Sequence, residues 1–136
     1  MVHALKAKNL GTTPNHFHLL NPDLTKFYPQ KFLDLTKLNP TVAAKKIGIS
    51  RPNFYKDEIS LAKNEKLTKK IMEFIVSADL AFELLGENKK ETLLWLSSPN
   101  TAFFGDTPLE ICLRGEGRRL IEWLLTRLGK GPGIGL

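Results

Sequence analysis

Three kinds of side chain in this sequence have types that can do chemistry: a close pair of histidines, a lone cysteine and fourteen carboxylates. His16 and His18 could ligate a metal together, but no Cys or further His is placed to complete a site, so surface histidines are the better interpretation. Cys112 stands between Ile111 and Leu113 on an expected core face, which predicts a buried thiol and not a nucleophile. We therefore expect no metal site.

The acidic residues do not form a catalytic pattern either. No Gly-rich phosphate loop, Ser-His-Asp arrangement or pair of carboxylates at a convincing spacing occurs, and the visible Asp and Glu residues fit helix caps or solvated helix faces. The sequence therefore predicts a protein that is not an enzyme, holds no cofactor and works by recognition.

Composition limits the class of protein further. The 136 residues are 42% apolar, enough for one core or two small helical subdomains that share one. No apolar run reaches the roughly 20 residues of a membrane span, and the N-terminus lacks the continuous apolar segment of a secretory signal. We expect a cytoplasmic protein without membrane contact.

The net charge of +6 favours an acidic partner, of which DNA is the obvious candidate. The charge is unevenly distributed, because the segment from 71 to 110 contains only two cations, Lys89 and Lys90. Most cations lie in the middle of the chain: Lys26, Lys31, Lys37, Lys45, Lys46, Arg51, Lys56, Lys63, Lys66, Lys69 and Lys70. This pattern indicates a basic module joined to a more neutral one.

The elements that position these cations are predicted to be short helices. Residues 1–24 lack sustained periodicity and are expected to be an irregular arm. A helix is predicted from Pro29, and a second over 41–47 with Asn39-Pro40 as its N-cap and first turn. Gly48 permits the left-handed turn that ends the second helix, and Ser50 is placed to cap a third.

The spacing Ala44-x3-Gly48-x5-Phe54 matches the helix-turn-helix pattern of Xre-like regulators, which predicts a DNA-binding module over 25–63. Residues 50–59 would then form the recognition helix. A helical hairpin with a solvated basic face is the alternative, since Asp57 and Glu58 would repel phosphate. The predicted contacts are with bases, from Arg51, Asn53 and Tyr55 near the helix start at Ser50, and with phosphates, from Lys45, Lys46 and Lys56.

The second half is predicted to be a helical domain over 64–128. A long helix starts at Asn64 or Thr68 and ends before Gly86. The next helix starts with a cap-like Asn88-x-x-Glu91 and stops before Pro99. Thr107-Pro108-Leu109-Glu110 predicts a capping box, Gly115 ends that helix, and Gly117 permits close packing of the last one.

The order of these elements carries a resemblance. A Trp-Leu at 95–96, a Pro-Asn at 99–100, a Gly-x-Thr-Pro at 105–108 and a second Gly at 117 resemble the C-terminal toxin-binding domain of Xre/MbcA/ParS-type antitoxins. The resemblance implies an all-α protein whose partner is a RES-domain toxin that degrades or modifies NAD and is blocked sterically. It also implies that the basic module binds operator DNA as a homodimer, or within a toxin–antitoxin hetero-oligomer, and represses the shared operon.

The last helix and the residues after it are the predicted toxin contacts. Trp123 falls beside the outward, basic face of this helix, either as an exposed anchor or partly buried against a neighbouring helix. Residues 129–136 are expected to be a flexible tail, and the resemblance implies that the helix end enters the toxin's cleft. The candidate toxin-binding residues are Arg119, Trp123, Arg127, Lys130, Gly131 and Ile134.

Two other functions fit the sequence. One is a stand-alone helix-turn-helix transcriptional regulator whose C-terminal domain only dimerises. The other is a helical adaptor, which would show no salt-sensitive binding to DNA.

Overall fold

The computed structural model describes residues 15–130, and its regular structure is helical apart from two short strands, which confirms the predicted all-α class. Its elements run in this order: β1 (Lys26–Phe27), α2 (Pro29–Thr36), α3 (Pro40–Ile47), the 3-10 turn η1 (Arg51–Tyr55), β2 (Ile59–Ser60), η2 (Leu61–Lys63), α4 (Glu65–Leu84), α5 (Lys89–Leu96), η3 (Thr101–Phe103), α6 (Pro108–Leu113) and α7 (Gly117–Arg127).

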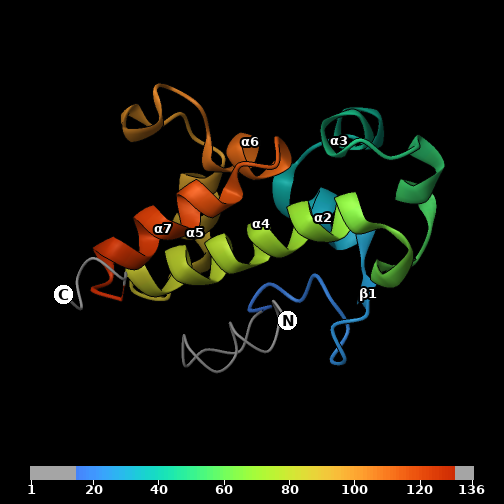
Figure 1. Ribbon diagram of the computed structural model, residues 1–136, viewed down its shortest axis with the longest axis horizontal. Coiled ribbons are helices and arrows are strands. Elements are labelled where there is room, and N and C mark those ends of the chain that lie inside the picture. The colour runs from blue at the N-terminus through green and yellow to red at the C-terminus, as the bar shows by residue number, and fades with distance from the viewer. Residues whose placement is uncertain (1–14, 131–136) are drawn as a thin grey trace.

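Helix α4 is the axis of the molecule (Figure 1). It begins after the N-cap position Asn64, one of the two predicted starts. Its 20 residues are long enough to contact elements of both halves of the chain. α2 and α3 lie toward its first turns, whereas α5, α6 and α7 pack along the rest (Figure 1). Its fully buried positions, among them Leu67, Ile71, Phe74 and Ala81, belong to the apolar face that the sequence predicts. Each Leu, Ile or Phe side chain among them contributes roughly 1.5–3 kcal/mol when it is fully buried.

Aromatic rings fill the core beneath the first half. Phe32 of α2 is fully buried and meets Phe27 and Phe74 edge to face, with centroids 5.8 and 5.6 Å away. Phe54 of η1 is a third neighbour of Phe32, with ring centroids 6.5 Å apart. Since Phe74 belongs to α4, these contacts join the N-terminal elements to the central helix.

Several helix ends follow the predicted capping chemistry. Asn39 Oδ1 accepts a hydrogen bond from the Val42 N–H at 2.8 Å, and Gly48 ends α3 with φ of 92°. Thr107 and Glu110 form the predicted capping box, with reciprocal bonds of 3.0 Å. These local signals place the helix ends correctly because each cap satisfies backbone groups that the helix leaves open.

The predicted recognition helix over 50–59 is wrong. Only Arg51–Tyr55 is helical, as a 3-10 turn without a side-chain cap from Ser50, and Ile59–Ser60 forms a strand. This strand pairs antiparallel with β1, where Phe27 lies opposite Ile59 and the Lys26 ammonium meets the Glu58 carboxylate at 2.8 Å. Burying the β-branched Ile59 in this pairing stabilises an extended chain where the sequence predicts a helix.

Residues 15–24, the described part of the predicted arm, are irregular as predicted but well packed, and residues 1–14 lie outside the described residues. Leu19 and Leu20 are buried, and Leu20 forms a β-bridge with Phe27. The backbone N–H groups of Asn15 and His16 donate to the Asp79 carboxylate of α4 at 2.7 and 2.9 Å. A buried carboxylate therefore holds the start of the described chain.

The side chains that could do chemistry take different positions. The His16 ring packs against Phe82, with centroids 4.8 Å apart, while His18 is exposed. Cys112 is buried as predicted, 3.6 Å from the Ser77 hydroxyl, and burial raises the pKa of its thiol to about 12. Within residues 15–130, no group of three His, Cys, Asp or Glu side chains is arranged to hold a metal ion. In the same range, no helix has the length and apolar character needed to cross a membrane.

Candidate binding surfaces

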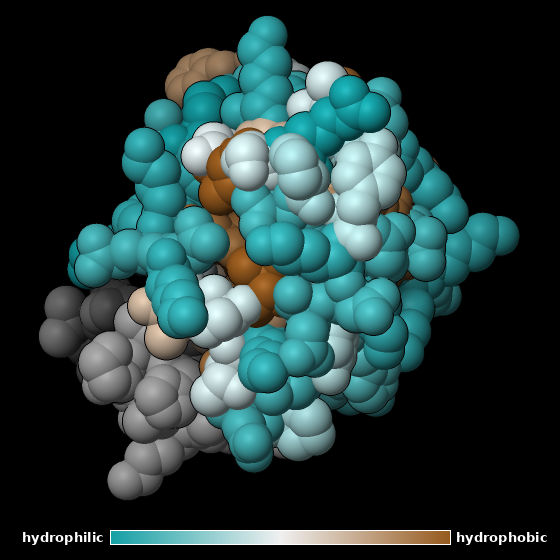
Figure 2. Space-filling view, turned by 90° about the vertical axis from the view of Figure 1, so that its right-hand side faces the viewer, coloured by the Kyte–Doolittle hydropathy of each residue, from teal (hydrophilic) through white to brown (hydrophobic). Residues whose placement is uncertain are grey.

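The candidate DNA-binding residues gather at one end of the molecule, formed by the C-terminal turn of α3 and by η1. Lys45, Lys46 and Lys56 are all exposed there. Figure 2 shows that this end is covered mostly by hydrophilic residues, with a narrow apolar strip between them. The structure thus brings the sequence-predicted phosphate contacts onto one accessible surface, which we call the basic end.

The candidate base-reading side chains are already engaged within η1. The Arg51 guanidinium lies 5.7 Å from the centre of the Tyr55 ring and donates to its hydroxyl at 3.3 Å. Asn53 Nδ2 donates to the Ser50 carbonyl and hydroxyl oxygens at 3.1 and 2.9 Å. Reading a base edge would require Asn53 to leave these bonds, whereas the three lysines can meet phosphates as they stand.

A lysine of α4 holds α3 in place at the basic end. Lys70 Nζ donates to the Ile47 carbonyl at 2.8 Å and to the Lys46 carbonyl at 3.3 Å, so it satisfies carbonyl groups that the end of α3 leaves open. Burial lowers the pKa of Lys70, and the nearby ammonium groups of Lys66 and Lys69 lower it further. The basic end is therefore attached to the central helix by a cation that sequence analysis counted only as surface charge.

A second candidate surface surrounds Trp123 on α7. Its ring stacks on Trp95 of α5, with centroids 6.0 Å apart and planes 20° apart, and meets the buried Phe103 edge to face at 5.3 Å. The Arg127 guanidinium lies over Trp123 at 4.5 Å. Trp123 is half-buried, so partial burial, the second of the two predicted alternatives, is confirmed. Its partners Trp95 and Phe103 could not be predicted from the sequence, because no local periodicity links the three rings.

The remaining candidate toxin contacts flank this aromatic stack. Arg119 Nη2 meets the Glu116 carboxylate at 3.0 Å, and Lys130 Nζ meets the Glu83 carboxylate of α4 at 2.8 Å. Gly131 and Ile134 lie outside the described residues. The structure therefore groups Arg119, Trp123 and Arg127 on α7, with Lys130 just beyond its end.

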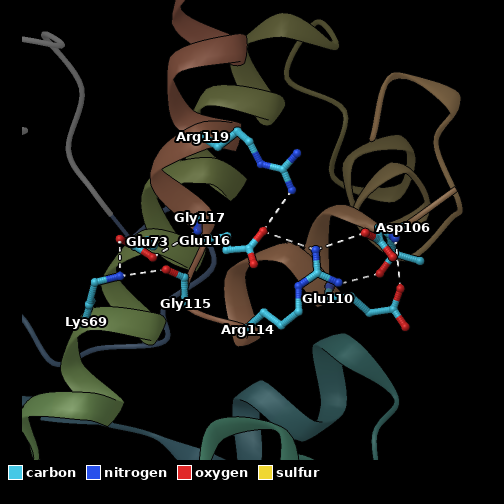
Figure 3. A network of polar contacts seen from close by, with 10 residues as sticks. Lys69, Glu73, Asp106, Glu110, Arg114, Gly115, Glu116, Gly117 and Arg119 are labelled. Atoms are coloured by element: carbon cyan, nitrogen blue, oxygen red, sulfur yellow. Dashed lines mark hydrogen bonds and ion pairs between the residues drawn. The ribbon is translucent and has the colours of Figure 1, made fainter. Parts of the chain in front are cut away.

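A polar network fastens the start of α7 to α4 (Figure 3). Lys69 Nζ bridges the Glu73 carboxylate at 3.0 Å and the Gly115 carbonyl at 2.8 Å, while Glu73 Oε1 accepts the Gly117 N–H at 3.1 Å. A Cβ on Gly117 would lie 2.6 Å from Glu73 Cβ, which confirms the close packing predicted for this glycine. In the same view, Arg114 joins Asp106 to Glu116 (Figure 3).

The two halves also meet at a hollow of about 180 Å³, lined by Lys46, Asp106, Glu110, Leu113 and Arg114. Its charges are mixed, and Arg114 and Glu110 are already used in the ion pairs and the capping box described above. We therefore interpret the hollow as part of the junction between the two halves and not as a ligand site.

Comparison with known proteins identifies the second half. Residues 80–131 match the family described as Antitoxin Xre/MbcA/ParS C-terminal toxin-binding domain. No curated protein and no solved structure shows a significant match to the chain. The matched segment contains α5, η3, α6, α7 and the aromatic stack, so the predicted resemblance is confirmed there: residues 80–131 match a toxin-binding domain of the Xre/MbcA/ParS antitoxin type.

Proposed function

We propose that this antitoxin neutralises a RES-domain toxin that consumes NAD, by direct binding that blocks the toxin sterically. The observation that carries the proposal is the match of residues 80–131 to a toxin-binding domain. The aromatic stack gives this domain a rigid basis for an interface, since large rings with a neighbouring Arg are typical of binding hot spots. The chain end contributes Lys130 and the residues beyond it.

We further propose that the basic end binds operator DNA and so represses the operon shared with the toxin, with the antitoxin acting as a dimer or within the toxin complex. The support is the exposed cluster of Lys45, Lys46 and Lys56 beside Arg51. Because η1 is a single 3-10 turn, phosphate contacts supply most of the affinity in this proposal, and base readout adds less.

The toxin partnership is tested by co-expression with the product of the adjacent gene, followed by mass measurement of the purified complex. We expect the two chains to purify together and NAD consumption by the toxin to be suppressed. Deleting residues 129–136 is expected to restore NAD consumption, and full neutralisation by the shortened chain would place the inhibitory contact elsewhere. A stand-alone regulator would purify alone as a dimer.

The DNA contact is tested separately with the Arg51→Ala/Asn53→Ala double variant. Its affinity for operator DNA should fall while its affinity for the toxin stays the same. An equal loss of both affinities would contradict the assignment of DNA and toxin to different ends of the molecule.

A further inference from the structure

Phe104 is an outlier in both exposure and backbone conformation. Its side chain is 91% exposed, the largest fraction among the exposed large apolar residues of the described chain. Its backbone is left-handed, with φ of 57° and ψ of 34°, although it is not a glycine. Bulky residues rarely adopt this conformation, and strained residues of this kind cluster at functional sites.

The loop that carries Phe104 is closed and well supported. Asn100 donates from its N–H to the Asp106 carbonyl at 3.1 Å, and its own carbonyl accepts the Phe103 and Gly105 N–H groups at 3.0 and 2.9 Å. The Asn100 side chain accepts the Ala102 N–H at 2.9 Å. The loop is therefore held by its own backbone bonds, and Phe104 stands on a fixed base.

The neighbours of Phe104 anchor this base to the rest of the domain. Phe103 is buried against Trp123, and Asp106 is paired with Arg114 at 3.0 Å. Inward burial of Phe103, followed by the left-handed turn, leaves the Phe104 ring in solvent. The loop protrudes from the body of the molecule beyond α6 (Figure 1), so a partner can reach it.

Charge indicates what kind of contact this domain makes. The segment 80–130 carries seven Lys or Arg and seven Asp or Glu, so it has no net charge to attract a partner. Net charge then supplies no general attraction to a partner, and a rigid exposed aromatic ring is a strong source of affinity because little conformational freedom is lost on binding. Phe104 has these properties, and it lies within the segment that matches a toxin-binding domain.

We propose that Phe104 is an anchor that inserts into an apolar pocket on the toxin, in addition to the contacts of α7 and the chain end. This inference rests on the proposed function and adds a second contact region to it. The strain at Phe104 is kept because it turns the ring outward to the partner.

The test measures binding of the purified toxin from the adjacent gene to three full-length variants. Phe104→Asn suits a left-handed backbone and removes the ring, so we expect an unchanged or higher melting temperature and a loss of toxin affinity on the order of tenfold or more. Phe104→Tyr keeps the ring and should retain most of the affinity. Lys37→Asn is the matched control, because Lys37 is also exposed and left-handed, with φ of 62°, but lies at the end of α2.

The outcomes separate this inference from the proposed function. Weaker binding by Phe104→Asn, with Lys37→Asn unchanged, supports the anchor. Equal toxin binding by wild type and Phe104→Asn overturns the anchor while leaving the toxin partnership intact. If Phe104→Asn instead changes only the oligomeric mass of the free antitoxin, the ring contacts a second copy of this chain, and the anchor is likewise overturned. Failure of the wild type to bind the toxin overturns both proposals.

Discussion

The two halves of this protein share the central helix α4 but differ in their charge. Residues 15–79 carry eleven Lys or Arg against seven Asp or Glu, whereas residues 80–130 carry seven of each. The first half exposes lysines at the basic end, and the second presents two rings on fixed supports, the half-buried Trp123 and the exposed Phe104. A charged surface suits a polyanion such as DNA, and a neutral apolar one suits a folded protein.

The halves also differ in what holds them together. Fully buried phenylalanines around Phe32 fill the first, while the second adds the aromatic stack and the network through Glu73 to the start of α7. Buried side chains of α4 contribute to the packing of both halves, so a substitution that destabilises one half should also destabilise the other. This arrangement makes the predicted division into two modules open to direct experiment.

The largest expected effect comes from Phe32→Ala. Removing a fully buried ring that meets Phe27, Phe54 and Phe74 should cost about 3–5 kcal/mol of unfolding free energy. Because Phe74 lies on α4, calorimetry should show one transition at a lower temperature. A second transition that keeps the wild-type melting temperature would instead show that the C-terminal domain folds independently.

Gly117→Ala should have the next largest effect, confined at first to the second half. The new Cβ would lie 2.6 Å from Glu73 Cβ, so α7 must shift from α4 at a cost of about 1–3 kcal/mol. The free energy of unfolding, measured by denaturant titration, and the affinity for the toxin should both decrease. Glu73→Gln is the comparison, since its amide oxygen can still accept the Gly117 N–H while the ion pair with Lys69 is lost, and an equally large loss in that variant would show that this ion pair matters as much as the close packing at Gly117.

Charge removal at the basic end should weaken DNA binding selectively. In a Lys45→Ala/Lys46→Ala/Lys56→Ala variant, we expect the slope of log affinity against log salt to fall by about three, with an affinity loss of about tenfold or more near physiological salt. Lys89→Ala/Lys90→Ala/Arg118→Ala removes the same charge from exposed positions of the neutral half. Similar losses in both variants would mean that net charge alone, and not the basic end, governs DNA binding.

The last prediction concerns the pH dependence of the carboxylate that holds the start of the described chain. Burial raises the pKa of Asp79 to about 6, although the His16 and Asn15 N–H groups and the His16 charge act in the opposite direction. Because the pKa of Asp79 is higher in the folded than in the unfolded state, its contribution to stability is fully present below pH 3.8, the pKa of the unfolded state. This contribution is lost as the pH rises through 6. The stability of the wild type relative to Asp79→Asn should therefore fall between pH 4 and 6, by up to about 1.4 kcal/mol per unit. A pH-independent difference would contradict this assignment.

Local signals predicted the second half more accurately than the first. The caps at Asn88 and Thr107 and the glycine after α4 are each visible within a few residues, and the structure places helix ends at all three. The helix predicted over 50–59 was wrong because the end of this segment pairs with β1, which lies more than 30 residues before β2 in the chain. A strand of two residues has no periodicity of its own to reveal it.

The candidate binding residues show the same limit. Lys45, Lys46 and Lys56 are exposed together, as the charge distribution predicts. Phe104 escaped notice because the sequence pattern around Gly105 indicates a tight loop, but not which ring turns inward. Only the packing of Phe103 on Trp123 decides that.

By itself, the sequence determined the all-α class, the main helix caps, the uneven charge and the family of the C-terminal domain, because each depends on composition or on residues close together in the chain. The tertiary structure decided the extended pairing at Ile59, the burial of Asp79 beneath the arm, the stacking of Trp95 on Trp123 and the exposure of Phe104. Each of these depends on residues distant in the chain, or on competition for the same core space, that no local pattern records.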